Sequence, residues 1–598
     1  MTAPQATTPH VLLSVVDAIN SGARTQTDSS WVLHPEGEWS LRFAARLSVP
    51  ATNFVPNESI WHLVVWTTLN GEAAHVYPDA THGITATFPH QDYNGEAYPP
   101  RHWRLGKPCL EKSSGVFNRT SWSNEPRNLA ERLPWLLQRL LDWIDAAASD
   151  SLSVEGDPLE LPALPGQSLF PVLGFREIAG GLSQWMPRHG SWGYASTSPL
   201  RGADSTRVIT EFQLPDGETI RTIEWSPSVL GKGRTSDAVW LVLPELPVAR
   251  PWQAPTSWLE LNERLAANHI NFEKLLVEMG RAVRLSLRRA PPWVLLLGFP
   301  IAEQVGLAPS RLHWLAIRSP SLASKTARRK GFRSCERNHR KWDAEIAMSK
   351  EHLKWQRTAN WASDQLRTRG AAENEMCGRR ILLIGAGSLG SSVAENLLRM
   401  GVCELGILDY DWVMMGNLSR HTLSMQAVGH KKAKALAAHL NECMPDARVR
   451  AFDTRFPPQN EQLEQAVRSY DVIVDCTGDD EVLDALASFD WKSEKLFVSL
   501  AMTWRAEGLF AYSASESSFP AIDAKSRFAA SPTPPLNDLD AQIEGIGCWH
   551  AVFPATADDV QLWGAIGSKF IRRAVLSPRR RYEYFRQMPD GTVERANE

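Results

Sequence analysis

The stretch ILLIGAGSLG at residues 381–390 constrains the fold of this chain more than any other part of its sequence. An apolar run typical of a buried strand leads into Gly385, Gly387 and Gly390, which make the pattern G-x-G-x-x-G, and a helical alternation of apolar residues follows. Glycines allow a sharp turn that brings backbone N–H groups, at the positive end of the helix dipole, close to phosphate oxygens. The pattern predicts a Rossmann-like strand, turn and helix that bind a nucleotide.

The next apolar run ends in an acidic residue, Asp409. A carboxylate at this point in a Rossmann-like unit accepts hydrogen bonds from a ribose. The glycine turn and Asp409 alone are typical of a dinucleotide-dependent oxidoreductase. The residues that follow favour a different chemistry.

Three polar residues downstream of Asp409 indicate a triphosphate. Asn417 and Arg420 stand in the run NLSR, and Lys432 stands in GHKKA. A dinucleotide pyrophosphate is held largely by the turn and the helix dipole, whereas cleaving a triphosphate puts charge on a leaving pyrophosphate and calls for fixed cations. A planar arginine and a lysine point charge supply them. These residues favour a triphosphate over a redox cofactor.

A buried strand at residues 471–475 leads into a cluster of carboxylates formed by Asp475, Asp479 and Asp480. Carboxylate oxygens are suited to holding Mg²⁺ on phosphates. The sequence therefore predicts a magnesium site at this end of the strand.

Taken in order, the motifs G-x-G-x-x-G, D-x-D, N-L-S-R, G-x-x-K-A and D-C-T-G-D resemble those of the ThiF-type adenylating family over residues 379–573. This family includes ubiquitin-activating enzymes and sulfur-carrier adenylyltransferases. The resemblance implies ATP and Mg²⁺ as cofactors. It assigns the ribose to Asp409, the phosphates to Asn417, Arg420 and Lys432, and the Mg²⁺ to Asp479.

The chain departs from the family pattern at two motifs, which are usually N-L-N-R-Q and D-C-T-D-N. The magnesium role therefore stays open among Asp475, Asp479 and Asp480. The family is usually dimeric, with an arginine from a helix before the first strand reaching the partner's site. Arg367 and Arg369 are the candidates for that role.

Cys548 is the candidate for a catalytic cysteine in this part of the chain. It stands between glycines in GIGCWH, with His550 close by, and it follows a stretch rich in Pro, Ser and Asp at residues 526–540. That stretch resembles the crossover loop that carries the catalytic cysteine in ubiquitin-activating enzymes. A loop cysteine near a histidine can be both exposed and activated.

The N-terminal region places a second cysteine, Cys109, in a different layout. A helix at residues 11–21, strands at 39–49, 61–66, 75–78 and 85–89, a proline-rich loop and a helix at 128–148 are expected. This layout resembles a ubiquitin-conjugating domain, and GKPCL matches its G-x-x-C-L motif. A lone cysteine is most often a buried hydrophobe, but Arg104 and Lys107 make this loop electropositive, which lowers a thiol pKa.

The His-Pro-Asn tripeptide that usually precedes the conjugating cysteine is missing. Residues 99–101 read Pro-Pro-Arg instead. The group that stabilises the oxyanion is therefore unassigned, and His102 is the candidate near Cys109.

The region at residues 161–374 carries no recognisable catalytic motif. Strands at 238–243, 293–299 and 312–317, with a helix at 256–281, predict a βαβ unit in a structural adaptor. A basic run at 328–333 fits a solvated helical face better than a nucleic-acid surface.

Composition narrows the possible partners and the compartment. Lys and Arg number 64 against 67 Asp and Glu, so the net charge of −3 gives no footprint for nucleic acid or an anionic membrane. No signal peptide or membrane span is recognisable, and we expect a cytoplasmic protein. The seven scattered cysteines favour neither disulfides nor a zinc site.

Together these features predict an α/β multidomain protein. It would comprise a ubiquitin-conjugating-like α+β fold at residues 1–150 with Cys109, an α/β linker domain at 160–374, and a Rossmann-like ThiF-type adenylation domain at 375–598 with Cys548. This order resembles the activating–conjugating fusion proteins of bacterial anti-phage cyclic-oligonucleotide systems, called CBASS.

That resemblance implies a relay in which the C-terminal tail of a partner, a cGAS-like nucleotidyltransferase, is adenylated. The tail then passes as a thioester from Cys548 to Cys109 and is joined to a target lysine, in a homodimer. Three alternatives remain: a sulfur-carrier adenylyltransferase, a catalytically silent partner-binding module, and an oxidoreductase.

Overall fold

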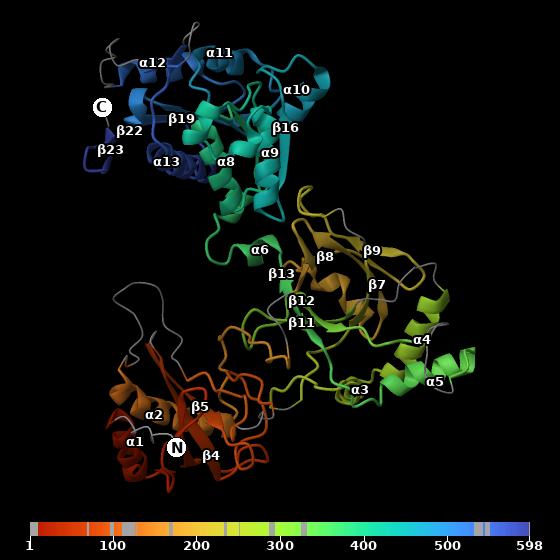
Figure 1. Cartoon of the computed structure of the whole chain (residues 1–598). Helices are drawn as coiled ribbons and strands as arrows, with labels where there is room; N and C mark the ends of the chain where they lie inside the picture. Colours follow the sequence, from red (N-terminus) through yellow and green to blue (C-terminus); the bar gives the residue numbers. More distant parts are fainter. Residues whose placement is uncertain are drawn as a thin grey trace.

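The chain forms three lobes, each built around its own β-sheet (Figure 1). The computed structural model describes residues 10–68, 71–95, 101–110, 126, 128–166, 171–231, 236–249, 251–285, 294–323, 332–531, 542–544 and 550–596. Among these residues, no helix combines the length and the apolarity needed to cross a membrane.

The first lobe is an antiparallel meander covered by two helices. Its elements are α1 (His10–Ser21), β1 (Thr25–Gln26), β2 (Val32–Leu33), β3 (Glu38–Arg46), β4 (Glu58–Thr68), β5 (Gly71–Pro78) and α2 (Leu129–Ala148). The sheet order is β1-β3-β4-β5, with β2 paired to β3. Asn128 caps α2 by accepting a hydrogen bond from the N–H of Glu131 at 2.9 Å. Both predicted helices and the first three predicted strands are confirmed.

The predicted fourth strand at residues 85–89 is wrong. The buried side chain of Asn94 donates hydrogen bonds to the carbonyl oxygens of Ile84 and Ala86, which places a side chain where a strand partner would lie. The carbonyl of Thr87 accepts a hydrogen bond from the N–H of Trp252, in the second lobe, at 3.0 Å. The side-chain bonds from Asn94 and the long-range bond from Trp252 override the strand composition of the segment.

The second lobe is an eight-stranded sheet that curls back on itself. Its strands are β6 (Val172–Phe175), β7 (Trp192–Leu200), β8 (Ala203–Gln213), β9 (Thr219–Thr222), β10 (Ser236–Val242), β11 (Val294–Ile301), β12 (Arg311–Arg318) and β13 (Trp355–Asn360). The order is β6-β13-β12-β11-β10-β7-β8-β9, and β6 also pairs with β8, which closes a ring. Trp185, Trp240 and Trp314 are fully buried in one core cluster of this lobe.

The predicted βαβ unit is confirmed, with one correction. β10 and β11 are parallel neighbours, but the segment between them contains two helices, α3 (Trp258–Ala267) and α4 (Phe272–Leu285). His269 has a positive φ of 60°, and the Asn271 side chain accepts a hydrogen bond from the N–H of Lys274 at 2.8 Å. The left-handed residue ends one helix and the asparagine starts the next.

Of the predicted basic run at 328–333, the structure describes residues 332 and 333, which precede a helix rather than lie on it. Residues 328–331 lie outside the described residues, and α5 (Glu336–Ile346) follows. Exposed Arg340 and Lys341 face Glu336 and Glu345 at spacings of four residues, with atom separations of 3.8 and 3.9 Å. Such pairs are typical of a solvent-facing helix surface.

The third lobe is a doubly wound α/β sheet. Its strands are β14 (Arg380–Ile384), β15 (Glu404–Leu408), β16 (Arg448–Phe452), β17 (Val472–Asp475), β18 (Lys495–Met502), β19 (Gly508–Glu516), β22 (Arg581–Gln587) and β23 (Val593–Ala596). They lie in the order β16-β15-β14-β17-β18-β19-β22-β23, parallel from β16 to β18 and antiparallel beyond. The strand order reverses between β14 and β17, where such folds bind their ligands.

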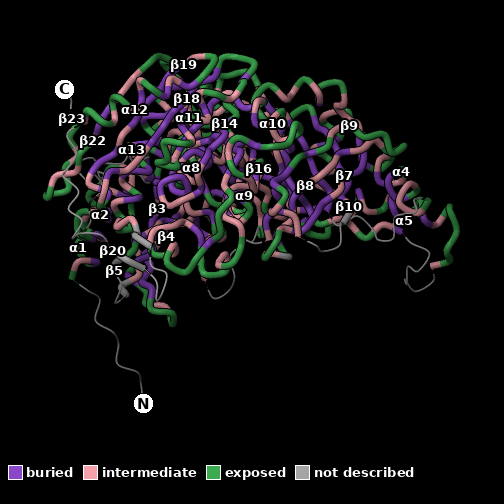
Figure 2. Tube along the Cα trace, turned by 90° about the horizontal axis from the view of Figure 1, so that it is seen from above, coloured by how far each residue is buried: buried purple, intermediate pink, exposed green. Residues whose placement is uncertain are grey.

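Helices cover both faces of this sheet. α8 (Ser388–Met400), α9 (Lys432–Cys443) and α13 (Ala557–Leu576) share one core cluster, and α10 (Glu461–Arg468), α11 (Asp480–Ser488) and α12 (Ala521–Ala530) share another. Figure 2 shows buried residues along the strands and a mixture of buried and exposed residues along the helices. Because α12 extends to Ala530, the predicted crossover loop at 526–540 is wrong in its first five residues. Residues 532–541 lie outside the described residues.

A short connection joins the second and third lobes through α6 (Ser363–Leu366) and α7 (Asn374–Cys377). Arg367, just after α6, forms a buried ion pair with Asp446 at 2.6 Å. Across the same junction, the N–H of Ser226 donates to the carbonyl of Pro445 at 2.9 Å. Arg367 is therefore held inside its own chain, which contradicts its candidacy to reach a partner's site. Arg369 is exposed.

Candidate active sites

The glycine turn joins β14 to α8, and each glycine faces a different neighbour. Gly385 has a φ of +91°, and a Cβ atom there would lie 2.9 Å from Cγ2 of Thr477. A Cβ atom on Gly390 would lie 2.0 Å from the carbonyl oxygen of Gly385, so the helix packs directly on the turn. Gly387 caps α8 and faces open space. The turn therefore leaves its backbone accessible to a phosphate at Gly387.

Asp409 follows β15 and holds the turn in place. Its Oδ2 accepts a hydrogen bond from the N–H of Ala386, and its Oδ1 accepts one from the N–H of Asp411, both at 2.7 Å. Each carboxylate oxygen has two lone pairs, so Asp409 can still accept hydrogen bonds from a ribose.

The candidate phosphate-binding cations are tied to the same network. Nζ of Lys432 lies 2.6 Å from Oδ2 of Asp411, and this bond lowers the pKa of the Asp411 carboxyl group although burial opposes the shift. Oδ1 of Asn417 accepts a hydrogen bond from the N–H of Met414 at 2.9 Å. Lys432 is thus linked through Asp411 and Asp409 to the glycine turn.

Arg420 connects the turn region to the segment that follows Cys548. Its guanidinium donates a hydrogen bond to the carbonyl oxygen of Phe553. Phe553 comes directly after β21 (His550–Val552), which pairs with β20 (Gln542–Glu544). Cys548 and the rest of residues 545–549 lie outside the described residues, and so does the side chain of His550. An arginine has five N–H donors, so Arg420 can bind an anion while keeping Phe553.

Sequence reasoning did not assign a role to His421, which contacts the turn itself. Its Nε2 lies 2.9 Å from the carbonyl oxygen of Ala386, and burial lowers the pKa of its imidazole. The sequence did offer a signal for this role, because His421 stands where the family motif N-L-N-R-Q usually has glutamine. A neutral histidine that donates to this carbonyl supports the turn, and the N–H of the same residue, Ala386, donates to Asp409.

The three candidate magnesium ligands differ in exposure. Asp475 is buried, accepts hydrogen bonds from the Thr477 and Ser499 side chains, and has a pKa raised by burial. Asp479 and Asp480 are exposed, and Oδ1 of Asp479 caps α11 by accepting from the N–H of Glu481 at 2.9 Å. An exposed carboxylate at the end of β17 fits a phosphate-bound Mg²⁺ better than one already satisfied by hydroxyl groups.

Cys109 lies at a second site, in the first lobe. It is exposed, and its backbone N–H donates to the carbonyl of His90 at 2.7 Å. Two further bonds tie its loop to residues 91–92: Gln91 Nε2 donates to the Gly106 carbonyl at 3.0 Å, and the Asp92 N–H to the Lys107 carbonyl at the same distance. Cys109 is thus an exposed thiol on a well-braced loop.

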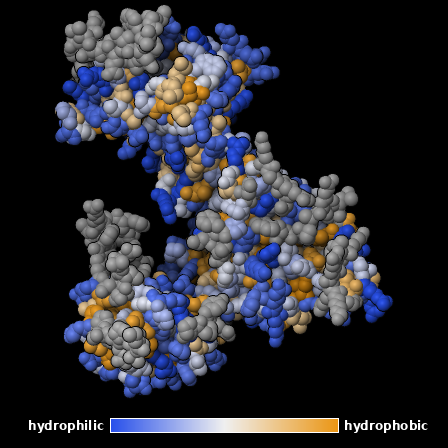
Figure 3. Space-filling model, in the orientation of Figure 1, coloured by the Kyte–Doolittle hydropathy of each residue, from blue (hydrophilic) through white to orange (hydrophobic). Residues whose placement is uncertain are grey.

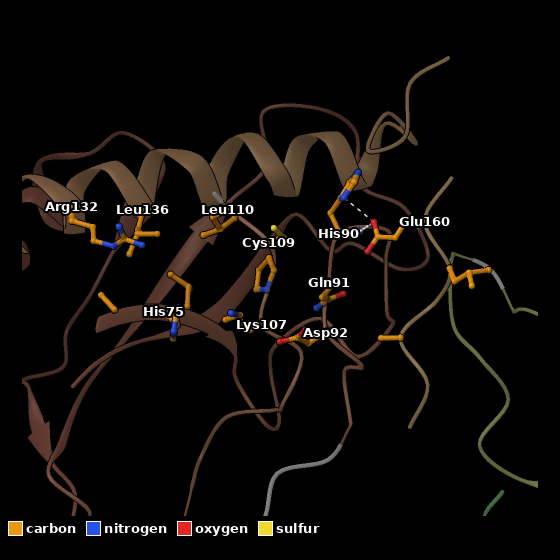
Figure 4. Close-up of a pocket in the computed structure, with 15 residues that line it drawn as sticks. His75, His90, Gln91, Asp92, Lys107, Cys109, Leu110, Arg132, Leu136 and Glu160 are labelled. Atoms are coloured by element: carbon orange, nitrogen blue, oxygen red, sulfur yellow. Dashed lines mark hydrogen bonds and ion pairs between the residues drawn. The ribbon is translucent and has the colours of Figure 1, made fainter. Parts of the chain in front are cut away.

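Cys109 borders a cavity of about 320 Å³ (Figure 4). Its polar lining mixes charges of both signs, from His75, His90, Asp92, Lys107, Arg132 and Glu160. His102, the histidine singled out from the sequence, is exposed and is absent from the described lining. Glu160, Leu161 and Ala163 come from the segment beyond α2, which no sequence pattern connects to Cys109.

Four other cysteines have the character of core thiols. Burial raises the pKa of Cys403 to about 12, that of Cys476 well above its ordinary value, and those of Cys377 and Cys443. A thiol with a raised pKa carries little thiolate and is a poor nucleophile.

Comparison with known proteins identifies relatives of the whole chain and of its parts. Residues 150–361 match the family of the Cap2 central linker domain, and residues 368–508 match the ThiF family. The ATP-dependent ubiquitin transferase-like protein Cap2 of Enterobacter hormaechei subsp. hoffmannii (strain UCI 50) is 52% identical over 587 residues, covering 98% of each chain.

Other relatives match a smaller part. The adenylyltransferase and sulfurtransferase UBA4 of Debaryomyces hansenii is 34% identical over 99 residues, 16% of this chain and 22% of that protein. The crystal structure of E. coli MccB with AMPCPP and MccA covers 38% of this chain and 65% of that one, at 12% identity and a TM-score of 0.27. A TM-score this low carries no argument about fold.

Proposed function

The chain belongs to the family of Cap2, an ATP-dependent ubiquitin transferase-like protein, and on that premise we propose a two-cysteine relay. Membership and the ThiF match make the protein an adenylating enzyme that uses ATP and has a ubiquitin-like transferase role. In the relay, the C-terminal carboxylate of a partner protein is adenylated, passes from Cys548 to Cys109 as a thioester, and is ligated to a target lysine.

The glycine turn is the proposed place of the first step. A carboxylate oxygen of the partner attacks the α-phosphorus of ATP, a P–O bond breaks, and pyrophosphate leaves with the electron pair. Backbone N–H groups at Gly387 bind phosphate oxygens, Asp409 binds the ribose, and Asn417, Arg420 and Lys432 bind the leaving phosphates. Fixed cations that meet this developing charge typically contribute several kcal/mol.

The exposed carboxylates beside β17 are the proposed magnesium ligands. Asp479 would hold the ion, with exposed Asp480 next to it, while buried Asp475 keeps its bonds to Thr477 and Ser499. Bound Mg²⁺ neutralises charge on the phosphates. The protein's own part is to present an unburied carboxylate at the switch point of the sheet.

Cys548 is proposed to take the acyl group from AMP, and Cys109 to take it from Cys548. In each step a thiolate attacks the acyl carbon, and AMP or the Cys548 thiolate leaves. The bond from Arg420 to Phe553 supports the first transfer, because it ties a phosphate-binding candidate to the segment that follows Cys548. Exposure of Cys109 at a cavity supports the second.

A homodimer is proposed from an apolar surface beside the nucleotide residues. Tyr410, Trp412, Met414, Met415 and Met425 are 48–70% exposed, an unusual density of large apolar side chains in one stretch. Figure 3 shows apolar surface on the third lobe, at the top of the view. The backbone N–H of Met414 bonds to Asn417, so a second copy covering this surface would lie against the ATP site. Arg369 is the remaining arginine candidate to reach across.

The partner and the division of labour are proposed from the resemblance of the whole chain to the CBASS fusion proteins. The tail would belong to a cGAS-like nucleotidyltransferase, and the modification would serve anti-phage defence in the cytoplasm. Residues 1–150 would conjugate, residues 160–374 would link, and residues 375–598 would activate.

The observation that carries this proposal is the coexistence of two separate sites on one chain, an open glycine cradle and an exposed cysteine at a cavity. The test is pyrophosphate exchange with the tail peptide, combined with detection of reducible adducts. Cys548→Ala should keep exchange and lose both thioesters. Cys109→Ala should keep exchange and the Cys548 thioester but lose conjugates.

Two results would contradict the relay. If the wild type gave no pyrophosphate exchange, the protein would be a binding module. If Cys109→Ala changed neither the yield of conjugates nor sulfur transfer, a sulfur-carrier adenylyltransferase would be favoured.

A further inference from the structure

The missing His-Pro-Asn tripeptide leaves open which group assists the attack of lysine at Cys109. One wall of the Cys109 cavity comes from outside the first lobe's own elements, at Glu160, Leu161 and Ala163. Residue 160 lies in the span that matches the Cap2 central linker domain. The site is therefore assembled from two parts of the chain.

His90 joins these two parts. Its Nδ1 lies 2.8 Å from Oε2 of Glu160, and its backbone N–H donates to the same oxygen at 3.0 Å. Its backbone carbonyl accepts the N–H of Cys109 at 2.7 Å. Glu160, His90 and Cys109 thus form one connected chain of contacts, and Figure 4 shows His90 and Glu160 together at one end of the cavity.

The backbone of His90 is held in an uncommon conformation. Its φ is +55°, in the left-handed region that most side chains avoid. Strained conformations of this kind persist where surrounding bonds hold them, and they cluster at functional sites. Both bonds to Glu160 hold His90 in this conformation, so the glutamate fixes the backbone and the ring at once.

We propose that His90 is the general base for aminolysis at Cys109, and that Glu160 is its positioning residue. This inference rests on the proposed relay. Because Nδ1–H donates to the Glu160 carboxylate, the neutral ring has its lone pair on Nε2, and His90 lines the cavity that the acceptor amine must enter. A base oriented by a third group is the arrangement by which many enzymes manage proton transfer.

The step balances without any further reactant. The lysine amine attacks the thioester carbonyl carbon as its free base, and Nε2 of His90 takes one proton as the C–N bond forms. The Glu160 carboxylate stabilises the imidazolium. The C–S bond then breaks, the Cys109 thiolate leaves, and it recovers the proton from His90 as a thiol.

The other basic groups at the cavity suit this task less well. The ring of His75 packs against Trp66 and Tyr77, at centroid distances of 5.6 and 6.4 Å. The side chains of Lys107 and Arg132 carry hydrogen-bond donors and no acceptor. His90 combines a place on the cavity with a carboxylate that orients its ring.

The test uses the full chain, charged on Cys109 with ATP and the partner protein and then depleted of ATP. Thioester discharge is followed with free lysine and with hydroxylamine, a strong nucleophile that is unprotonated at neutral pH and depends little on a base. His90→Asn is the main variant, because asparagine tolerates a positive φ. Glu160→Gln keeps a hydrogen-bond acceptor and removes the charge. His82→Asn and Glu155→Gln are matched controls outside the cavity lining.

We expect His90→Asn to slow discharge to lysine by about 100-fold, the lower end of general-base effects, and discharge to hydroxylamine by less than about 3-fold. Glu160→Gln should give the same selectivity at roughly 10-fold. The controls should match the wild type.

Equal slowing with both amines would overturn the base assignment, because it would indicate a displaced loop. Undiminished discharge to lysine would overturn it as well, and a lysine-selective defect in His75→Ala would move the role to His75. A wild type that never carries a thioester on Cys109 would overturn the relay itself, and the base assignment with it.

Discussion

The glycine turn is one continuous run at residues 385–390, whereas the Cys109 cavity is lined by segments spread over residues 74–163. In the turn, Gly385 and Gly390 contact each other directly, and Asp409 bonds to Ala386 between them. At the cavity, β5, three loops and α2 each supply part of the wall. Binding a phosphate needs a fixed backbone shape, which a short sequence can specify. Presenting an exposed thiol to changing partners needs only a braced loop, which many sequences can provide.

Gly390→Ala tests this comparison most directly. The new Cβ atom would meet the Gly385 carbonyl at 2.0 Å, so the turn or α8 must shift. We expect pyrophosphate exchange to fall below detection and unfolding to become easier by about 3 kcal/mol, at the upper end of overpacking costs.

Gly387→Ala is the matched control for Gly390→Ala, because Gly387 faces open space. It should fold normally and raise the KM for ATP. Equal unfolding temperatures for Gly390→Ala and wild type would contradict the packing argument.

Removing the Arg420 guanidinium tests whether a placed cation beside the turn stabilises the charge that develops on the phosphates. Arg420→Ala should lower the rate of pyrophosphate exchange by about 10²–10³-fold, the usual cost of losing one donor to developing charge. Lys434 is an exposed lysine on the same helix as Lys432, and it pairs with Asp453 beyond β16. Lys434→Ala should leave exchange unchanged. Similar losses in both variants would mean that general positive charge, rather than placed cations, drives the step.

Gly106→Ala applies the glycine test to the Cys109 loop. A Cβ atom there would lie 2.5 Å from the Cβ and Oδ1 atoms of Asn94, and Gly106 lies three residues before Cys109. We expect about a 10-fold loss of Cys109 thioester, roughly the cost of 1–2 kcal/mol of overpacking, with pyrophosphate exchange intact. A loss of exchange would show that the two sites are not independent.

The last prediction concerns the junction between the second and third lobes. Burial alone raises the pKa of Asp446, but hydrogen bonds from Arg367 and Ser363 outweigh it and lower this pKa to about 2. The carboxylate therefore stabilises the fold above its unfolded pKa of about 4, and this contribution, of about 2 kcal/mol, is lost as the pH falls from about 4 towards 2.

Chemical denaturation from pH 7 to pH 3 measures that loss. Asp446→Asn should be less stable than wild type at pH 7, and the gap should narrow towards pH 3. A constant gap would mean that the pair acts through shape rather than charge.

The sequence predicted best where structure is local. The strand, turn and helix at 381–400 follow from glycine spacing and apolar periodicity, and the parallel pairing of β10 with β11 follows from a strand–helix–strand pattern. It failed where distant residues decide the outcome. Residues 85–89 have the composition of a strand but are hydrogen-bonded to Asn94 and Trp252. Arg367 stands where an arginine that reaches a partner's site is expected, but it is paired with Asp446.

The contrast between local and distant contacts also explains why the sequence predicted one candidate site better than the other. Asp409, Asn417, Arg420 and Lys432 could be named from motifs, and the structure places Asp409 and Lys432 on one hydrogen-bond network. Glu160 could not be linked to Cys109, because only the folded chain brings residue 160 to residue 90. The surroundings of Cys548 stay a prediction.

The pairing of β6 with β8 has a mechanical consequence for the proposed acyl transfer. Seven of the eight strands form a closed ring, with β9 as an outer strand paired to β8, so the second lobe resists shear and behaves as a rigid spacer, here called the strut. Any change in the separation between the lobes that carry Cys109 and the nucleotide turn must then come from bending at the ends of this strut, near Glu160 and near Arg367. A carrier arm of fixed length, pivoting at two defined joints, would set how far the tethered tail must travel.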